Sequence, residues 1–267
     1  MNVKCQLLKL TPLITICIIF FASCSDDNEP IQLDFPCLSG TLETGLLAFY
    51  PFYNGSAADF SSNSNDLNNM AAVPTLDRNG QVDCAFKLDN SASIEQFLFL
   101  EDPSFLDGLN EFSISLWYMP QDSSRSVGDY ELLIGRGDTL RCPDRNGEWS
   151  VGLYDCRKAV FGRTNSVWAN PISGLDCTAE LIAQTDVWKH VVIVQVEDAM
   201  SLHINGEFQG ISFGDANCIN PPQVQDQGTL FLGKYFTGVL DDVLIYDRAL
   251  SSEEIQQLFA WEPCCVD

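Results

Sequence analysis

The chain has 267 residues, with 37 acidic and 14 basic side chains and a formal charge of −23 at neutral pH. Such an excess of negative charge argues against nucleic acid, anionic glycans and anionic lipids as partners, because each of these is itself negatively charged. The charge favours divalent cations, and the length suits one large all-β domain.

The first residues have the pattern of a secretion signal. Lys4 and Lys9 precede the apolar run 13–21, and two small residues stand directly before Cys24. An apolar run of that length is typical of a cleaved signal and too short for a membrane span. We therefore expect residues 1–23 to be removed, which takes away two lysines and leaves a formal charge of −25.

Small residues before a cysteine resemble a bacterial lipobox, in which Cys24 is acylated and becomes the first residue. The acidic stretch 25–27 is similar to the segment that sends lipoproteins of Bacteroidetes-type bacteria to the cell surface. The resemblance implies an outer-membrane lipoprotein, exposed at the cell surface and bound to the membrane through its lipid alone. An ordinary cleaved signal is the alternative. The polar segment 24–44 is expected to be a tether, and residues 45–267 the domain.

Eight of the eleven cysteines lie beyond the signal and Cys24. An even number of cysteines in an exported chain predicts disulfides. The alternative, a zinc site, is not favoured because the sequence has no C-x-x-C pair. Eight cysteines allow 105 pairings. We expect Cys142 to pair with Cys156, Cys177 with Cys218, and the first two cysteines to meet the last two. The eight are Cys37, Cys84, Cys142, Cys156, Cys177, Cys218, Cys264 and Cys265.

Strand patterns with turn residues between them recur along the domain. Residues 112–118 alternate between apolar and mixed positions, and Asn205-Gly206 supplies the positive φ angles of a hairpin. So many short strands without helices between them predict an antiparallel two-sheet sandwich or jelly roll. The expected strands are 46–52, 86–89, 93–100, 112–118, 131–135, 149–154, 159–163, 188–196, 200–204, 229–232 and 239–246.

One short helix is expected near the end of the chain. Ser251 is followed three residues later by Glu254, which predicts a capping box. Leu250 and Ile255 can form a hydrophobic staple across it, and the helix body covers residues 253–260.

Three segments together resemble the laminin-G-like, concanavalin A-type jelly roll. They are residues 45–66, residues 188–206 with their hairpin, and residues 238–260 with the capped helix. The resemblance implies two stacked antiparallel sheets, one of them curved into a concave face. It implies no activity, because this fold hosts enzymes, lectins and adhesion modules. The stretches 142–177 and 214–227 are longer than the family needs and are expected to be added loops.

The catalytic pattern of related glucanases is missing. No Glu-x-Asp-x-x-Glu run exists, and Asp241 and Asp242 are neighbours that should point to opposite faces of a strand. Neither His190 nor His203 has a nearby serine or cysteine pattern such as the nucleophile elbow. We therefore expect no enzyme activity.

Calcium is the cofactor that the sequence favours. Carboxylate, amide and hydroxyl oxygens are the ligands that calcium seeks at six to eight coordination. The site is expected in the loop 59–66, and the family resemblance implies that Asp241 or Asp242 completes it. The alternative is a loop of Asx turns in which these side chains cap their own backbone. The loop offers Asp59, Ser61, Asn63, Asn65 and Asp66.

Aromatic side chains are the natural platform for a sugar ring. Trp149, Tyr154 and Trp168 lie in the expected added loop and are the candidates for an exposed platform, with packing beneath the loop as the alternative. Trp117 and Trp188 fall on strands and are expected in the core. The sequence thus predicts a noncatalytic module that binds a glycan or a cell-surface protein. An accessory subunit of an outer-membrane complex is the second hypothesis, and a glycoside hydrolase or lyase the third.

Overall fold

The computed structural model describes residues 38, 40–91, 94–121, 130–137, 148–154, 157–163, 166–169, 184–197, 199–213 and 228–262. Contacts divide the chain into Met1–Asp34 and Phe35–Asp267, and every described residue belongs to the second unit. Among those residues, we find no helix with the length and apolar character that a membrane crossing needs. Cys24 and the rest of the signal lie outside the described residues.

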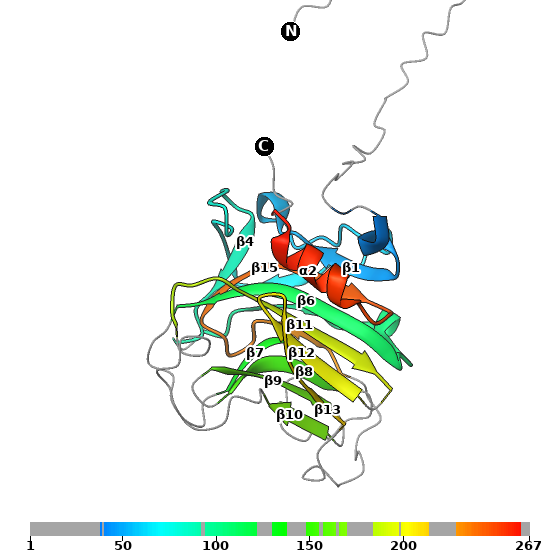
Figure 1. Cartoon of the computed structure of the whole chain (residues 1–267). Helices are drawn as coiled ribbons and strands as arrows, with labels where there is room; N and C mark the ends of the chain where they lie inside the picture. The colour runs from blue at the N-terminus through cyan, green and yellow to red at the C-terminus, as the bar shows by residue number, and fades with distance from the viewer. Residues whose placement is uncertain are drawn as a thin grey trace, which may run out of the picture. The chain divides into compact units, whose positions relative to one another are not determined.

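One antiparallel sheet has eight strands (Figure 1). Its path runs β13–β12–β11–β6–β15–β4–β3, and β1 joins the later half of β15. The long central strands pair over most of their length, which places β6, β11 and β15 at the middle of the sheet. The strands are β1 Leu46–Tyr50, β3 Val73–Thr75, β4 Ala85–Leu88, β6 Glu111–Pro120, β11 Lys189–Val196, β12 Ala199–Ile204, β13 Glu207–Ser212 and β15 Gly238–Tyr246.

The second antiparallel sheet has seven strands in the order β10–β9–β8–β7–β14–β5–β2. Side chains from both sheets form one buried cluster, so the two sheets stack face to face as a sandwich. This confirms the predicted all-β jelly roll. The strands are β2 Asn68–Met70, β5 Phe97–Leu100, β7 Tyr130–Arg136, β8 Trp149–Tyr154, β9 Lys158–Arg163, β10 Ser166–Ala169 and β14 Leu230–Leu232.

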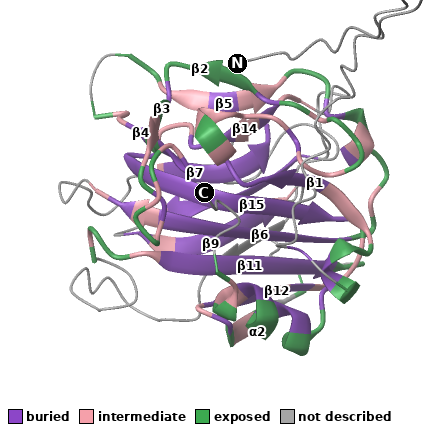
Figure 2. Cartoon of the chain, turned by 90° about the horizontal axis from the view of Figure 1, so that it is seen from above, coloured by how far each residue is buried: buried purple, intermediate pink, exposed green. Residues whose placement is uncertain are grey.

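The central strands of the eight-stranded sheet are buried on both faces, as Figure 2 shows for β6, β11 and β15. On β6, Ile114 and Leu116 point into the sandwich, and Ser113 and Ser115 lie on the outer face. The alternation predicted for this strand is therefore correct, but its mixed face is buried rather than solvated. The reason is a second layer on top of the sheet.

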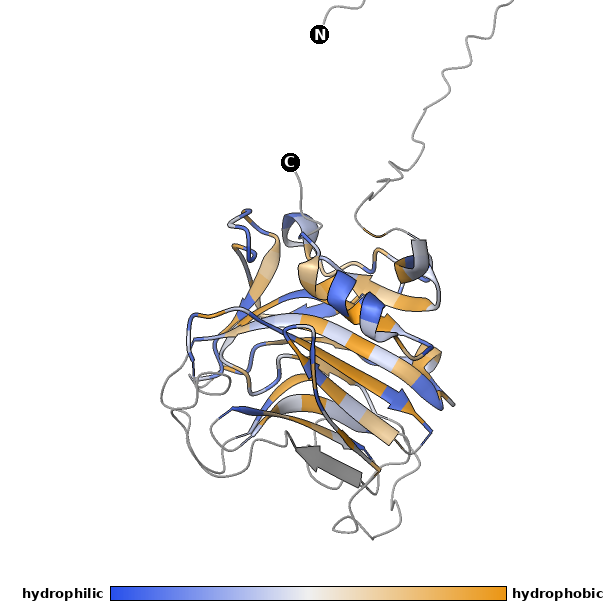
Figure 3. Cartoon of the chain, in the orientation of Figure 1, coloured by the Kyte–Doolittle hydropathy of each residue, from blue (hydrophilic) through white to orange (hydrophobic). Residues whose placement is uncertain are grey.

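That layer is the helix α2 (Ser252–Ala260). Ser251 Oγ accepts a hydrogen bond from Glu254 N, and the Glu254 carboxylate accepts one from Ser251 N, which confirms the capping box. Leu250, Ile255 and Leu258 pack in a second buried cluster on the outer face of the sheet. The side of the helix turned away from the sheet is hydrophilic (Figure 3), so one apolar stripe fixes its orientation.

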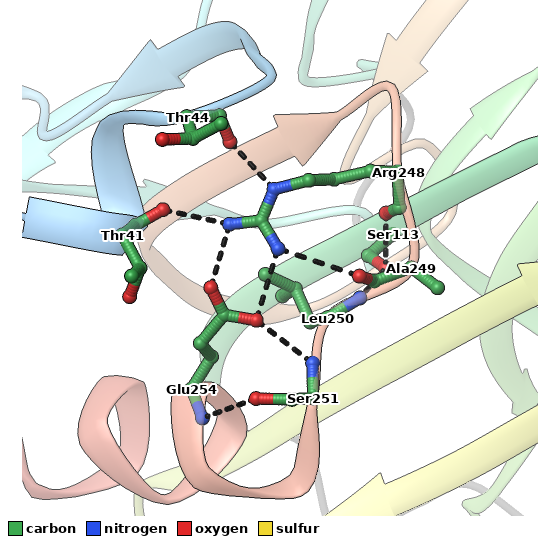
Figure 4. Close-up of polar contacts among 8 residues, drawn as sticks. All are labelled: Thr41, Thr44, Ser113, Arg248, Ala249, Leu250, Ser251 and Glu254. Atoms are coloured by element: carbon green, nitrogen blue, oxygen red, sulfur yellow. Dashed lines mark hydrogen bonds and ion pairs between the residues drawn. The ribbon is translucent and has the colours of Figure 1, made fainter.

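Arg248 fastens the start of the domain to this helix (Figure 4). Its guanidinium donates to the carbonyl oxygens of Thr44 (2.7 Å) and Thr41 (2.7 Å) and to both carboxylate oxygens of Glu254 (2.8 and 2.9 Å). Thr41 belongs to the short 3-10 helix η1 (Gly40–Glu43), whose Leu42 is buried beside α2. The last residues of the expected tether thus pack on the domain. Two further 3-10 helices are η2 (Tyr53–Gly55) and η3 (Ser104–Leu106).

The structure tests two predictions about the connections between strands, the hairpin at Asn205-Gly206 and the added loop at 142–177. Asn205 and Gly206 have φ of 52° and 78° and join β12 to β13, which confirms the predicted hairpin. The stretch 142–177, expected to be an added loop, contains β8, β9 and β10, which extend the seven-stranded sheet from β7. The strands predicted at 149–154 and 159–163 are thus confirmed as β8 and β9, and only the expectation that the stretch is an added loop was wrong.

Candidate functional site

The predicted calcium loop is held by hydrogen bonds within itself. Asp59 Oδ1 accepts from Phe49 N (2.9 Å) and Ser61 N (2.8 Å), and its Oδ2 accepts from Ser61 Oγ (2.8 Å) and Asn65 N (2.8 Å). Asp66 Oδ1 accepts from Asp59 N (2.9 Å). The Asp59 carboxylate therefore uses all four of its lone-pair sites on protein donors. This is the Asx-turn arrangement named above as the alternative.

The remaining predicted calcium ligands also have protein partners. Asn63 donates its amide to the carbonyl oxygens of Leu46 (3.1 Å) and Leu47 (3.0 Å), and Asp241 lies with Arg78. Within the described ranges, no three histidine, cysteine, aspartate or glutamate side chains are placed to hold a metal ion. In this conformation the donor set does not fit calcium, which would have to replace several hydrogen bonds. Calcium binding by the loop stays a prediction.

Asp241 and Asp242 share one guanidinium instead of pointing to opposite faces. Arg78 Nη1 donates to Asp241 Oδ2 (3.0 Å) and also to Asp242 Oδ2, and Arg78 Nη2 donates to the carbonyl oxygen of Trp261 (3.0 Å). The expectation failed because β15 is bulged after Asp241 and Asp242 has φ of 41°. Burial and the adjacent Asp242 charge raise the pKa of Asp241 well above its usual range.

A ring stack continues this cluster under α2. The Arg78 guanidinium lies 4.6 Å from the centroid of the Trp117 ring, and Trp117 contacts His190 (5.0 Å) and Phe259 (5.7 Å). Trp117 is thus buried, as predicted, while Trp188 is only half-buried. These contacts connect the loop before β4 to the helix and leave the outer face of the eight-stranded sheet sealed there.

Ser115 and His190 form a pair that the sequence analysis did not foresee. Ser115 Oγ lies 2.8 Å from His190 Nε2, a distance at which a histidine can activate a hydroxyl. Both residues are about 1% exposed, and burial, followed by the Arg78 charge, lowers the pKa of His190 to about 3. A base that weak, with no access for substrate, does not support nucleophilic catalysis.

The predicted sugar platform is not formed by exposed tryptophans. Trp149 is 5% exposed on β8 and packs in the core, 5.5 Å from the ring of Phe112. Its assignment to an exposed platform was wrong, because odd-numbered positions of β8 point between the sheets. Tyr154, at the end of β8, is half-buried on the other side of the strand. Trp168 lies on β10, and its side chain is outside the described structure.

Aromatic side chains instead gather on the outer side of the seven-stranded sheet. The Phe97 ring contacts Phe99 (5.7 Å) and Phe231 (5.4 Å), and Tyr235 contacts Tyr130 (6.2 Å). All are half-buried, in contrast to the fully buried Leu98, Leu230 and Leu232 at the alternate positions. We call this surface the aromatic face, and its members are Phe97, Phe99, Tyr130, Phe231 and Tyr235 with Lys234.

Lys234 lies among these rings. Its Nζ is 4.5 Å from the centroid of Phe231, 5.3 Å from that of Tyr235 and 5.7 Å from that of Phe97. Attraction between an ammonium and ring faces at such distances fixes the position of the charge. The exposed side chain of Met70 extends the aromatic face, since it stands opposite Phe97 in the β2–β5 register.

The sequence analysis missed this surface, although a signal existed. In 97–100 and 230–232 both alternate positions are large and apolar, so neither side of the strand reads as solvated. Both segments were predicted to be strands, and no surface was assigned to either of them. The structure shows that one set of these side chains fills the core, while the other forms a half-exposed surface.

One predicted cysteine is visible. Cys84 is disulfide-bonded, and its partner is outside the described residues. The other seven cysteines of the predicted framework, like Cys24, the predicted site of lipidation, also fall outside them, so their pairing stays a prediction. The seven are Cys37, Cys142, Cys156, Cys177, Cys218, Cys264 and Cys265.

Comparison with known proteins identifies the family. The Laminin_G_3 profile, described as the concanavalin A-like lectin/glucanases superfamily, matches residues 92–256. The chain belongs to this family. A search of characterised proteins finds no sequence that matches it.

Solved structures share the fold of this Laminin_G_3 protein. The binding domain of Paraclostridial Mosquitocidal Protein 1 is 16% identical with a TM-score of 0.58, and the match covers 81% of this chain and 52% of that one. The binding domain of botulinum neurotoxin DC, in complex with rat synaptotagmin II, is 17% identical with a TM-score of 0.60, covering 82% and 52%. The same domain in complex with SialylT is 16% identical with a TM-score of 0.60, covering 82% and 51%. The chain thus spans about half the length of these domains.

Proposed function

We propose that this protein is a noncatalytic binding module that holds a glycan on its aromatic face. The observation that carries the proposal is the set of half-buried rings around Phe97 and Phe231 on an outer sheet surface. A ring face can stack on the apolar face of a pyranose, and aromatic side chains supply large contact area at low entropy cost. The neighbours of known structure, which are binding domains, are in keeping with a binding role.

The surroundings of the candidate catalytic groups in the described structure support the same proposal. In the described part of the chain, the Ser115–His190 pair is buried beneath α2, and the Asp241–Asp242 pair is engaged by Arg78. Glu131, an isolated acid in the sequence, is 1% exposed and accepts hydrogen bonds from Arg157 Nε (2.8 Å). None of these groups meets the aromatic face in an exposed cleft.

The test is a glycan array with the wild type and two phenylalanine variants. Phe231→Ala removes the central ring of the aromatic face and should abolish or strongly weaken glycan binding. Phe208→Ala is the matched control, because Phe208 is 60% exposed but lies on β13 of the other sheet. Both variants should be compared with the wild type by thermal unfolding.

The outcomes separate the hypotheses. Equal loss of binding in both variants would point to unfolding rather than to a site. Binding of a surface protein, with no glycan bound, would select the protein-binding alternative. Release of a product from a polysaccharide would contradict the noncatalytic proposal.

We also propose that the module is anchored at the bacterial surface by lipid on Cys24. The support is the small-residue pair before Cys24 and the acidic residues that follow it. Cys24→Ala should release the protein from membranes or block its processing. Unchanged membrane fractionation would refute the anchor and leave the binding proposal untouched.

A further inference from the structure

Lys234 is the cation that the fold places on the aromatic face. Its ammonium lies 4.5 Å from the Phe231 ring centroid and within 6 Å of two more rings, so its position is set by the same residues that would stack on a sugar. Arg78 and Arg248 lie elsewhere in the described structure: Arg78 contacts Asp241 and Asp242 under α2, and Arg248 contacts Glu254.

The end of the sheets near this surface carries further positive charge. Tyr130 of the aromatic face precedes Glu131, which pairs with the buried Arg157 (2.8 Å). Lys189, on the first position of β11, is 3% exposed, and burial together with the nearby Arg157 charge lowers its pKa to about 8. Lys189, Arg157 and Glu131 thus lie near one another at this end of the sandwich, in a chain that is otherwise strongly acidic.

We propose that the glycan bound at the aromatic face carries a single carboxylate, as in a terminal uronic or sialic acid, and that Lys234 binds that carboxylate. This rests on the proposed glycan-binding function. The apolar side of the sugar would stack on Phe231 and Phe97 while the acid group meets the ammonium. A contact between opposite charges that is partly shielded from water is much less screened by salt than the field of distant charges.

The charge of the whole chain explains why one carboxylate fits better than many. A polyanionic glycan would bring further acids to a protein with a formal charge of −23. Their mutual repulsion acts over the Debye length, which is about 8 Å at physiological ionic strength and about 30 Å at 0.01 M. The argument from net charge against anionic glycans therefore applies to polyanionic glycans and does not apply to a glycan with a single carboxylate.

The experiment compares matched neutral, singly acidic and polyacidic glycans on one array. We expect the strongest binders to carry one acidic residue, and Lys234→Met to weaken them by about tenfold or more, a larger factor than for neutral glycans. Lys234→Arg should keep the preference. Lys87→Met is the control, since Lys87 is exposed on β4 of the other sheet. Lowering the ionic strength should weaken polyacidic binders and not singly acidic ones.

Contrary results are distinguishable. Neutral glycans as the strongest binders, with loss of binding in Phe231→Ala, would overturn the acidic-ligand inference and leave the proposed function standing. An unchanged acidic preference in Lys234→Met would overturn the role of Lys234. Failure of every glycan to bind would overturn both the inference and the glycan-binding function.

Discussion

Replacing Arg248 by methionine should show how strongly the start and the end of the domain are held together. The variant keeps a long apolar stem and removes every donor that reaches Thr41, Thr44 and Glu254. Each of these bonds involves a charged group, and hydrogen bonds to charged groups contribute about 1.5–3 kcal/mol when shielded from water. The Arg248 side chain is 23% exposed, so each bond should contribute less than that range.

The pKa of Glu254 gives a second estimate of the effect. Its hydrogen bonds to Arg248, followed by those of the cap, lower this pKa from 4.5 to about 2. A difference of that size corresponds to about 3 kcal/mol of preferential stabilisation of the ionised carboxylate at most. Solvent screening reduces this upper bound, so we expect Arg248→Met to lower the free energy of unfolding by about 2 kcal/mol at pH 7. For a domain of this size that is a fall of about 4–8 °C in Tm.

The pH dependence provides the sharper assay. Because the folded-state pKa of Glu254 is depressed, its contribution is present above about pH 4.5 and is lost as pH falls towards 2. The free energies of unfolding of wild type and Arg248→Met, measured in urea, should therefore become equal as the pH falls through that range. A double-mutant cycle with Glu254→Gln should give a coupling of about 1–2 kcal/mol at pH 7. Coupling near zero, or a difference that does not change with pH, would refute the reasoning.

Three further predictions concern buried groups. Asp241→Asn should raise the free energy of unfolding at neutral pH by about 1 kcal/mol, because the raised pKa of Asp241 means that its ionised form destabilises the fold. This gain should disappear below about pH 4, where the carboxyl is protonated in both states; a loss of stability at pH 7 would contradict it. If the Asp59 loop binds calcium as the sequence suggests, a chelator should lower the Tm of wild type and not that of Asp59→Ala; an unchanged wild-type Tm would leave the loop to its Asx turns. Trp149→Ala should cost about 3–5 kcal/mol by denaturant unfolding, since it empties a core position; a loss of ligand binding with unchanged stability would return Trp149 to a surface role.

Local chemistry was enough to predict several elements of this fold. The capping box at Ser251 and the hairpin at Asn205-Gly206 depend on neighbours in sequence, and both are present. The long strands were also predictable, because their apolar patterns extend over many residues. The short β2 and β3 were missed, since a three-residue strand carries too little periodicity to stand out.

The site depended on geometry that no pattern contains. The bulge of β15 turns Asp242 to the guanidinium that Asp241 already contacts, and a regular strand would have separated them. Phe97 and Phe231 lie 134 residues apart and meet only because β5 pairs with β14. Trp149 was misassigned because its stretch was expected to be an addition to the family fold, whereas the strand predicted there continues the sheet from β7 and turns Trp149 into the core.

The fastening of Thr41 and Thr44 by Arg248 also fixes the side of the sandwich on which the chain enters the domain. The chain enters the domain beside α2, over the outer side of the eight-stranded sheet, where Leu38 and Leu42 are buried. The aromatic face lies on the outer side of the other sheet, across the full thickness of the sandwich. The chain therefore enters the domain on the side of the sandwich opposite the aromatic face, and the residues that lead into it do not cover the proposed glycan site.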